Sequence, residues 1–463
     1  MKQYLFIALS IILCWNCEPT TDTEADTTEA AWTALFNGKD LTGWKKLNGE
    51  AAYEVVDETI VGTTTLNTPN TFLATEKMYS DFALQLEYRV DDNINSGIQI
   101  RSNSLPAYKE GRVHGYQVEI DPSDRAWSSG IFDEARRGWL YPLSVNEKAR
   151  SAFKHNEWNK VYVECIGNTI KTWLNDVPVT HLIDDMTSEG FIALQVHSIG
   201  DSTQAGKNIE WKNIQIKTEN IEPREGDFPY VVNTIPNHLS EDEKEKGWTL
   251  AWNGENTEGW RGAHMEAFPE KGWKIEDGTL QVEASDGAES ENGGDIITEA
   301  EYAAFEFQTE FMLTEGANSG IKYFITEGYG PRKGSAIGLE FQILHDAVHP
   351  DAKKGRDGNR TLGSLYDLIT AEKQKRFVKK PGEWNHARVV VKPDNKVEHW
   401  LNHQKVVEYK KGSEEFMDLV KISKYKDFEG FGLWEKGHIL MQDHGDYVAL
   451  RSVIGRRLDY RSI

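Results

Sequence analysis

The stretch NSGIQIRS, residues 95–102, begins with the same four residues as NSGIKYFI, residues 318–325, at an offset of 318 − 95 = 223 positions. The flanking sequences also match. LFNGKDLTGW, which ends at Trp44, aligns with AWNGENTEGW, which ends at Trp260, and HGYQVEI aligns with IGLEFQI. Because these motifs recur in the same order, the sequence indicates one domain repeated in tandem.

The second copy carries an insertion near its end. NEWNKVYVECIGNTIKTWLN aligns with GEWNHARVVVKPDNKVEHWLN so that Trp173 lies opposite Trp400, an offset of 400 − 173 = 227 positions. GFIALQVH then aligns with GHILMQDH at an offset of 437 − 190 = 247. This increase predicts roughly 20 additional residues in the second copy, around Lys411 to Glu429.

Each copy reads as a series of short strands. Apolar and polar residues alternate in FALQLEYRV (82–90), KVYVECI (160–166), TIKTWLN (169–175), FIALQVH (191–197) and IEWKNIQIK (209–217). This spacing places successive side chains on opposite faces of a strand, and turn sequences such as EDG and PDN separate the runs. Many short strands within about 200 residues predict an all-β fold, a sandwich or jelly roll, for each copy.

The segment between the copies contains three prolines and a short helix signal, in which Ser240 and Glu243 fit a capping box. We expect each copy to form its own jelly roll. The predicted organisation is a signal peptide (1–17), a flexible acidic tether (18–30), a first domain (31–219), a linker with a short helix (220–246) and a second domain (247–458).

The N-terminus has the pattern of a leader. Lys2 precedes an apolar run that is too short to span a membrane, and the run ends at LCWNC before an acidic, Thr-rich segment. This arrangement resembles a bacterial lipoprotein signal with Cys17 as the lipidated residue, although Asn16 stands where a small residue is usual. Cys14 is a weaker candidate because it lies inside the apolar run, and a plain secretory signal is the alternative. We expect an outer-membrane lipoprotein, facing the periplasm or the cell surface and held only by its lipid anchor. A palmitate analogue should label the protein and fail to label Cys17→Ala.

Composition narrows the range of partners. The formal net charge is −22, with 52 Lys and Arg against 74 Asp and Glu. A chain this acidic repels phosphate backbones, so nucleic acid is excluded as a partner. After the leader, Cys165 is the one remaining thiol. A disulfide within the chain or a cysteine-based zinc site is therefore excluded, and Cys165 is expected to be a buried strand residue.

The motifs LFNGKDLTGW, NSGI, GEWN, WLN and GHILMQDHGD resemble the 3-keto-disaccharide hydrolase domain family, over nearly the whole chain after the leader and twice. The resemblance implies a concanavalin-like jelly roll in each copy. It also implies a hydrolase or lyase that cleaves glycosides whose sugar carries a ketone at C3.

A ketone at C3 acidifies the hydrogen at C2. A general base can remove that proton to give an enediolate, after which the glycosidic oxygen leaves C1 and water can add back. Such a site needs a base, hydrogen-bond donors or a metal ion to hold the oxyanion, and an acid for the leaving group.

The strand HGYQVEID supplies the first candidates. Side chains alternate, so Gln117, Glu119 and Asp121 share one face, and Glu340 and Gln342 share the corresponding face in the second copy. The carboxylate and the amide have exchanged places between the copies. We interpret this face as the sugar-binding surface, with Glu119, Asp121 and Glu340 as candidate catalytic groups. The alternative is a solvated polar face of an edge strand.

Arginines near this strand are candidate substrate ligands. Arg101 ends the first NSGI strand, whereas its counterpart is Phe324. Because Asp121 and Arg101 lack counterparts in the second copy, we expect catalysis in the first copy. Further arginines that suit oxyanion or carboxylate recognition lie in EARRGWLY and GNRTLGSLY; they are Arg136, Arg137 and Arg360.

Histidines and aromatic residues complete the predicted site. His114 and His345 adjoin the polar strands and are the candidate acid–base histidines. The aligned His197 and His444 are expected to hold the final turn. Aromatic side chains near the polar strand are candidate sugar contacts; they are Trp139, Tyr141 and Tyr366.

Cofactor motifs are absent from the sequence: it has no phosphate loop, nucleotide fingerprint or Ser–His–Asp signature. Asp351 and Asp357 in HPDAKKGRDGN are candidate ligands for Ca²⁺ or another divalent metal ion, although the loop does not match an EF-hand. An alternative function uses the same sheet without catalysis, in a carbohydrate-binding surface lipoprotein. The loss of Arg101 and Asp121 equivalents in the second copy favours that alternative.

Overall fold

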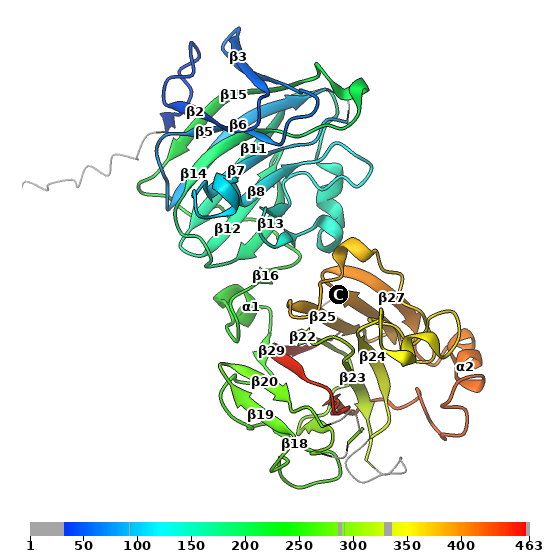
Figure 1. The fold of residues 1–463 in the computed structure, drawn as a ribbon. Coiled ribbons are helices and arrows are strands. Elements are labelled where there is room, and N and C mark those ends of the chain that lie inside the picture. The colour runs from blue at the N-terminus through cyan, green and yellow to red at the C-terminus, as the bar shows by residue number, and fades with distance from the viewer. Residues whose placement is uncertain (1–31, 92, 286–288, 291, 328–335, 460–463) are drawn as a thin grey trace, which may run out of the picture.

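A computed structural model describes residues 32–459, apart from 92, 286–288, 291 and 328–335. The expected signal peptide (1–17), the tether (18–30) and the lipidation residue Cys17 lie outside the described residues. Within the described part of the chain, no helix combines the length and apolar character that crossing a membrane requires. The two copies form two lobes, one above the other in Figure 1.

The first copy is a sandwich of two sheets whose strands are antiparallel except where a linker strand joins. Among the described residues, one sheet runs in the order β16 (Val232–Asn233), β13 (Val177–Ile183), β12 (Thr169–Leu174), β11 (Asn159–Ile166), β6 (Phe82–Val90), β15 (Asn208–Lys217), β4 (Thr59–Thr63) and β3 (Ala52–Val56), with β1 (Thr33–Ala34) beside β15. The facing sheet runs β10 (Gly138–Tyr141), β9 (Ile131–Glu134), β8 (His114–Ile120), β7 (Ser96–Asn103), β14 (Phe191–Val196), β5 (Thr71–Thr75) and β2 (Trp44–Asn48).

The second copy repeats this plan. One sheet runs β19 (Trp273–Glu276), β20 (Thr279–Val282), β29 (Val448–Arg457), β22 (Phe305–Leu313), β25 (Asn385–Val391), β26 (Lys396–Leu401) and β27 (Gln404–Lys410), with β17 (Thr249–Leu250) beside β29. The facing sheet runs β18 (Trp260–Gly262), β21 (Ile296–Thr298), β28 (His438–Met441), β23 (Asn318–Ile325) and β24 (Leu339–Leu344). In the described part of the chain, two α-helices accompany the sheets, α1 (Glu241–Glu245) and α2 (Glu414–Lys421).

The alternating sequences build the cores. In β6 the apolar side chains face the opposite sheet and are buried, while Gln85, Glu87 and Arg89 on the other face are partly exposed. Facing them across the first core are Ile98 and Ile100 of β7 and the apolar residues of β8. The all-β sandwich prediction is confirmed, and Cys165 is a buried residue of β11, as expected.

The linker contains the short helix that the sequence predicts, and this helix is capped at its start. Ser240 caps α1 by accepting a hydrogen bond from the Glu243 amide, and the Glu243 carboxylate accepts one from the Ser240 amide, 2.9 Å away. The predicted capping box is thus confirmed. Just before the helix, β16 pairs in parallel with β13 of the first copy, which ties the linker to that lobe.

The two lobes contact each other directly. Phe377 of the second copy packs on the core of the first, with its ring 5.7 Å from that of Trp127. The linker residue Tyr230 donates a hydrogen bond to Gln308, 2.6 Å away, and Ser144 donates one to the His403 carbonyl, 2.7 Å away. These contacts fix how the lobes lie relative to each other.

Candidate functional site

A pocket of about 360 Å³ opens on the outer face of the second copy's smaller sheet. Residues two apart on a strand point to the same face, so polar side chains from neighbouring strands together form the floor of the pocket. Adjacent strands β23 and β24 place Lys322 directly opposite Glu340, and the next pair of positions on this face is Gly320 opposite Gln342. Gln442, which follows β28, completes the floor.

Glu340 is the acidic group at the centre of this floor. Its side chain is buried, and desolvation raises the pKa of the carboxyl to about 7, against the opposing effect of the Lys322 and Lys424 cations. A carboxyl with this pKa exchanges protons near neutral pH, which is the property that a general base requires.

Lys322 supplies a buried positive charge beside Glu340. Burial favours its neutral form, but the nearby carboxylates of Asp295 and Glu340 outweigh burial, and the pKa of Lys322 is raised. The Lys322 ammonium lies 3.4 Å from the Asp295 carboxylate. Lys322 therefore remains an ammonium ion, a suitable neighbour for a developing oxyanion.

The insertion in the second copy forms a wall of the pocket. It contains α2, and the turns after this helix bring Lys424, Tyr425 and Phe428 to the pocket lining. The Lys424 ammonium lies over the ring of Tyr366, 4.1 Å from its centroid, and 5.1 Å from that of Tyr425. Desolvation of this ammonium lowers the pKa of Lys424, although much of the side chain is exposed.

Several buried polar atoms in the pocket are unpaired. Among the described residues, Oε1 of Gln342, Oε1 of Gln442 and Nδ1 of His444 have no hydrogen-bond partner. Buried polar groups in proteins are normally paired, so unpaired ones that line a pocket are candidate ligand contacts. The hydroxyl groups of a sugar provide both the donors and the acceptors that these atoms need.

The same positions in the first copy hold neutral amides. Gln99 stands opposite Gln117 on β7 and β8, where the second copy has Lys322 opposite Glu340. Gln117 Oε1 accepts hydrogen bonds from Gln99 at 2.6 Å and Gln195 at 2.9 Å. All three glutamines are buried. This amide cluster satisfies most of its own hydrogen bonds and lacks the lysine–glutamate pair.

Glu119, the carboxylate predicted in the first copy, belongs to the same cluster. Its two oxygens accept hydrogen bonds from Asn95 and Gln117, each 2.8 Å away, and Arg125 lies 3.6 Å from it. Desolvation raises the pKa of Glu119 to about 7. Its pKa thus matches that of Glu340, but both of its oxygens already have partners within the protein.

The glycine of each NSGI motif makes room for a polar side chain of the neighbouring strand on this face. A Cβ atom on Gly320 would overlap the Glu340 carboxylate, and one on Gly97 would overlap the Gln117 side chain. Glycine therefore lets the central polar group of the neighbouring strand lie across the motif. The asparagines of the motif contact the same face: Asn95 donates a hydrogen bond to Glu119, and Asn318 accepts one from Gln342, each on the adjacent strand.

Gly320→Ala should displace the Glu340 carboxylate, because the new methyl group takes the space that this carboxylate occupies. If this pocket cleaves a 3-keto-glucoside, as the family resemblance implies, turnover should fall by at least tenfold while the far-UV circular dichroism spectrum is unchanged, since one misplaced catalytic group can cost about 10²-fold. Gly455→Ala is the matched control, because its Cβ would meet only ordinary contacts. Equal turnover in the two variants would contradict this role for Gly320.

Arg101 has a structural position in the fold. It is buried, with hydrogen bonds to the Ser80 carbonyl and the Gly167 carbonyl, both 2.7 Å, and an ion pair with Asp81 at 2.9 Å. Asp121 likewise holds the turn that follows β8, through Arg125 at 2.7 Å and the Trp127 amide at 3.1 Å. In the first copy both side chains therefore bind groups of the protein itself.

The other arginines and aromatic residues predicted in the first copy are divided between core and surface. Tyr141 is buried and donates a hydrogen bond to the Tyr230 carbonyl, 2.9 Å away. Arg136 and Arg137 both bind the buried Asp133, at 2.7 and 2.6 Å. Together with the partly exposed Trp139 they line a second, larger cavity between the two lobes.

The two histidines predicted as acid–base groups hold loops. His114 Nδ1 lies 2.9 Å from the Arg112 carbonyl, and its ring packs on Tyr108 with centroids 4.1 Å apart. His345 Nδ1 accepts a hydrogen bond from the Gly316 amide at 3.0 Å. In contrast, His444, which we expected to hold a turn, lines the pocket of Glu340.

Asp351 binds protein groups in the structure. Its carboxylate accepts a hydrogen bond from Tyr366 at 2.7 Å and lies 3.3 Å from Arg360, which also binds Asp367 at 2.7 Å. Asp357 accepts a hydrogen bond from Thr370 through its main-chain carbonyl. Across the described residues, no cluster of three or more His, Cys, Asp or Glu side chains suits a metal ion.

The sequence could have indicated some residues that we missed. Lys322 alternates with Gly320 in NSGIKYF, so it shares the face of Glu340, and its counterpart in the first copy is Gln99. By contrast, Lys424 and Tyr425 lie in an insertion with no counterpart, and only the folded chain brings them to the pocket.

The chain is a jelly-roll protein in two copies. The model of the 3-keto-alpha-glucoside-1,2-lyase-like domain matches residues 31–217 and again residues 247–454, and the chain belongs to this family. This membership supports a glycoside-hydrolase-like function.

The chain is also similar to several named proteins. The 3-keto-disaccharide hydrolase of Bacteroides thetaiotaomicron is 36% identical over 233 residues, which cover 46% of this chain and 79% of the relative. A crystallised candidate glycosyl hydrolase from Parabacteroides distasonis is 30% identical, with a TM-score of 0.42, over 49% of this chain and 100% of its own. A carbohydrate-binding module from Bacillus subtilis is 18% identical, with a TM-score of 0.28, over 38% of this chain and 96% of its own.

Proposed function

We propose that the second copy cleaves 3-keto-glycosides and that Glu340 is its general base. One observation carries the proposal: a buried carboxyl with a pKa of about 7 lies at the floor of an open pocket, beside the buried ammonium of Lys322. Base and oxyanion stabiliser are the two groups that proton abstraction next to a ketone needs.

The reaction follows from this pair. The Glu340 carboxylate removes the proton from C2 of the sugar, and the electrons move to the C3 oxygen, which becomes an enediolate oxygen facing the Lys322 ammonium. The C1–O bond then breaks, and the departing oxygen takes a proton from a neighbouring acid. Water adds across C1 and C2, the hydroxyl to C1 and a proton from Glu340 to C2. Without this last step the enzyme is a lyase, and with it a hydrolase.

We assign catalysis to the second copy, in contrast to our expectation from the sequence. That expectation rested on Asp121 and Arg101, which hold the fold of the first copy. At the centre of the first copy, Gln117 replaces Glu340 and Gln99 replaces Lys322. An amide cannot accept a proton at neutral pH, so the first copy lacks the central base and the adjacent cation.

Turnover by the purified full chain of a panel of 3-keto-glucosides with different aglycones tests the proposal. Each reaction is run with added divalent metal ion and with chelator, because these arms show whether the chemistry depends on a metal ion. Release of the aglycone from the 3-keto-glucosides, and none from the matching glucosides without the ketone, is the expected result. Absence of turnover for every member of the panel would contradict the proposal.

The pH dependence should report the ionisation of Glu340. The carboxylate form is the active base, and the pKa of the carboxyl is raised to about 7. We therefore expect kcat/KM to fall about tenfold per pH unit below pH 7 and to level off above it. A plateau that extends unchanged down to pH 5 would show that a group with an ordinary carboxyl pKa is the base.

A further inference from the structure

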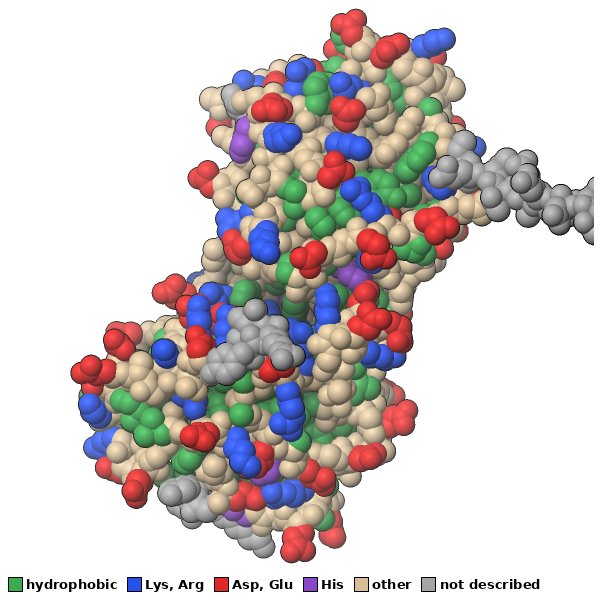
Figure 2. Space-filling view, turned by 180° about the vertical axis from the view of Figure 1, so that it is seen from behind, with side chains coloured by type: hydrophobic (Ala, Val, Ile, Leu, Met, Phe, Trp, Pro, Cys, Tyr) green, Lys and Arg blue, Asp and Glu red, His purple; other side chains and the backbone are tan. Residues whose placement is uncertain are grey.

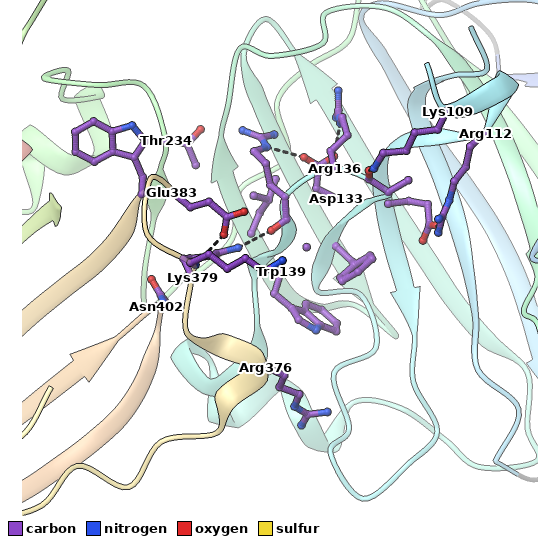
Figure 3. Close-up of a pocket in the computed structure, with 18 of the residues that line it drawn as sticks. Lys109, Arg112, Asp133, Arg136, Trp139, Thr234, Arg376, Lys379, Glu383 and Asn402 are labelled. Carbon is purple, nitrogen blue, oxygen red and sulfur yellow. Dashed lines mark hydrogen bonds and ion pairs between the residues drawn. The ribbon is translucent and has the colours of Figure 1, made fainter. Parts of the chain in front are cut away.

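A second cavity, of about 1300 Å³, lies between the two lobes. Figure 3 shows Arg112, Asp133, Arg136 and Trp139 of the first copy facing residues of the second copy across this space. We call it the interlobe cleft. It is separate from the pocket of Glu340, since no residue lines both.

The interlobe cleft reverses the charge balance of the chain. The whole sequence has 52 Lys and Arg against 74 Asp and Glu, whereas eight Lys and Arg and five Asp and Glu line the cleft. Arginines also neutralise three of the five acids: Asp133 binds Arg136, Glu134 binds Arg112 at 3.2 Å, and Glu310 binds Arg451 at 2.8 Å. A positive cleft in an acidic protein attracts anions selectively.

One segment of the second copy supplies the available positive charge. Arg376 and Lys380 are exposed, and within the described part of the chain neither has a carboxylate within 4.0 Å. Between them Lys379 reaches across the cleft and donates a hydrogen bond to the Arg137 carbonyl, 2.6 Å away (Figure 3). Arg376 donates a hydrogen bond to Gln374, 2.9 Å away, and lies over the Phe377 ring, 4.7 Å from its centroid. Two cations without an acidic partner among the described residues form a site for more than one negative group.

An aromatic surface belongs to the first copy's side of the cleft. Trp139 and Phe132 are partly exposed on the wall formed by β9 and β10, with ring centroids 5.4 Å apart. Trp139 also packs against Trp127, at 4.7 Å, and the Arg125 guanidinium lies over its ring, 4.9 Å from the centroid. These contacts hold the ring in place and leave the part that lines the cleft for a ligand. A rigid, half-exposed indole with a polar edge suits the apolar face of a sugar ring.

We propose that the interlobe cleft binds an anionic saccharide, with a sugar ring on Trp139 and its carboxylate or sulfate groups on Arg376 and Lys380. The cleft is a binding site additional to the catalytic pocket, and it does not depend on the proposed function of Glu340. Both kinds of anionic group suit Arg and Lys side chains.

Isothermal titration calorimetry of the full chain tests this proposal. The probes are an oligogalacturonate, a sulfated oligosaccharide and a neutral gluco-oligosaccharide of the same length. We expect at least one anionic probe to bind, more weakly as salt increases, and the neutral probe to bind at least tenfold more weakly. The two anionic probes show whether carboxylate or sulfate is preferred.

The double variant Arg376→Gln/Lys380→Gln should weaken binding of the anionic probe by about tenfold, because each exposed ion contact contributes a factor of about two to five. Lys353→Gln/Lys375→Gln removes the same charge from exposed positions outside the cleft lining and should bind normally. Glu340→Gln should also bind normally, which separates this proposal from the catalytic one. Equal binding by the two double variants, or no binding of either anionic probe, would overturn the proposal.

Discussion

Glu340→Gln should lower the turnover of a 3-keto-glucoside by about 10²–10⁴, the usual effect of removing a general base. The substitution keeps the shape of the side chain and removes its ability to take a proton. Lys322 would keep Asp295 as a partner at 3.4 Å, so we expect the fold to remain. Stopped assays of aglycone release, with circular dichroism to check the fold, measure the effect.

Glu119→Gln is the matched control, since Glu119 has the same burial and a pKa raised to the same value. We expect its turnover to lie within about twofold of the wild type, because the first copy lacks the lysine–glutamate pair. The opposite pattern, in which Glu119→Gln loses turnover and Glu340→Gln keeps it, would place the chemistry in the first copy.

Arg101→Ala should destabilise the protein by about 3 kcal/mol, because it removes a buried side chain with its hydrogen bonds and leaves a cavity. The guanidinium is almost fully buried and donates to the Ser80 and Gly167 carbonyls, whereas its ion-pair partner Asp81 is half exposed and keeps the Gly167 amide as a donor. Urea denaturation measures the change. Arg150→Ala is the control, because it breaks a surface pair with Glu147 and should cost less than 1 kcal/mol.

The same Arg101 variant also distinguishes a structural role from contact with substrate. If Arg101 is structural, turnover per folded molecule stays at the wild-type level under conditions where the variant is folded. A loss of turnover larger than the unfolded fraction, with an unchanged urea midpoint, would restore Arg101 as a substrate ligand.

The sequence predicted the fold well because each signal was local. Alternation along FALQLEYRV predicts β6 over the same residues, 82–90, and the capping box at Ser240 depends on only four residues. Aligning the two copies of the repeat also showed which strands correspond. It also identified the polar face that holds both glutamates, since the side chains of a strand alternate regardless of the rest of the chain.

The same reasoning ranked the two copies on Asp121 and Arg101, because it could not see what these residues contact in the fold. On the polar face each copy has one carboxylate beside one amide, and the exchange of Lys322 for Gln99 is readable in the sequence. The rest of the difference is three-dimensional. Asn95 and Gln117 occupy the oxygens of Glu119, whereas Glu340 opens into a pocket with a wall built from the distant Lys424 and Tyr425. Similarly, Arg101 was predicted to bind substrate because the sequence does not show that its side chain is buried.

The docking of Phe377 on the first lobe has a consequence for how the chain unfolds. A partly buried ring of one lobe packs against the core of the other, and this contact, together with the Tyr230–Gln308 hydrogen bond, makes the free energies of the two lobes interdependent. The lobes should melt as one cooperative unit, and a ligand that stabilises either lobe should raise the melting temperature of both. The tandem repeat is thus a single thermodynamic system built from two similar halves.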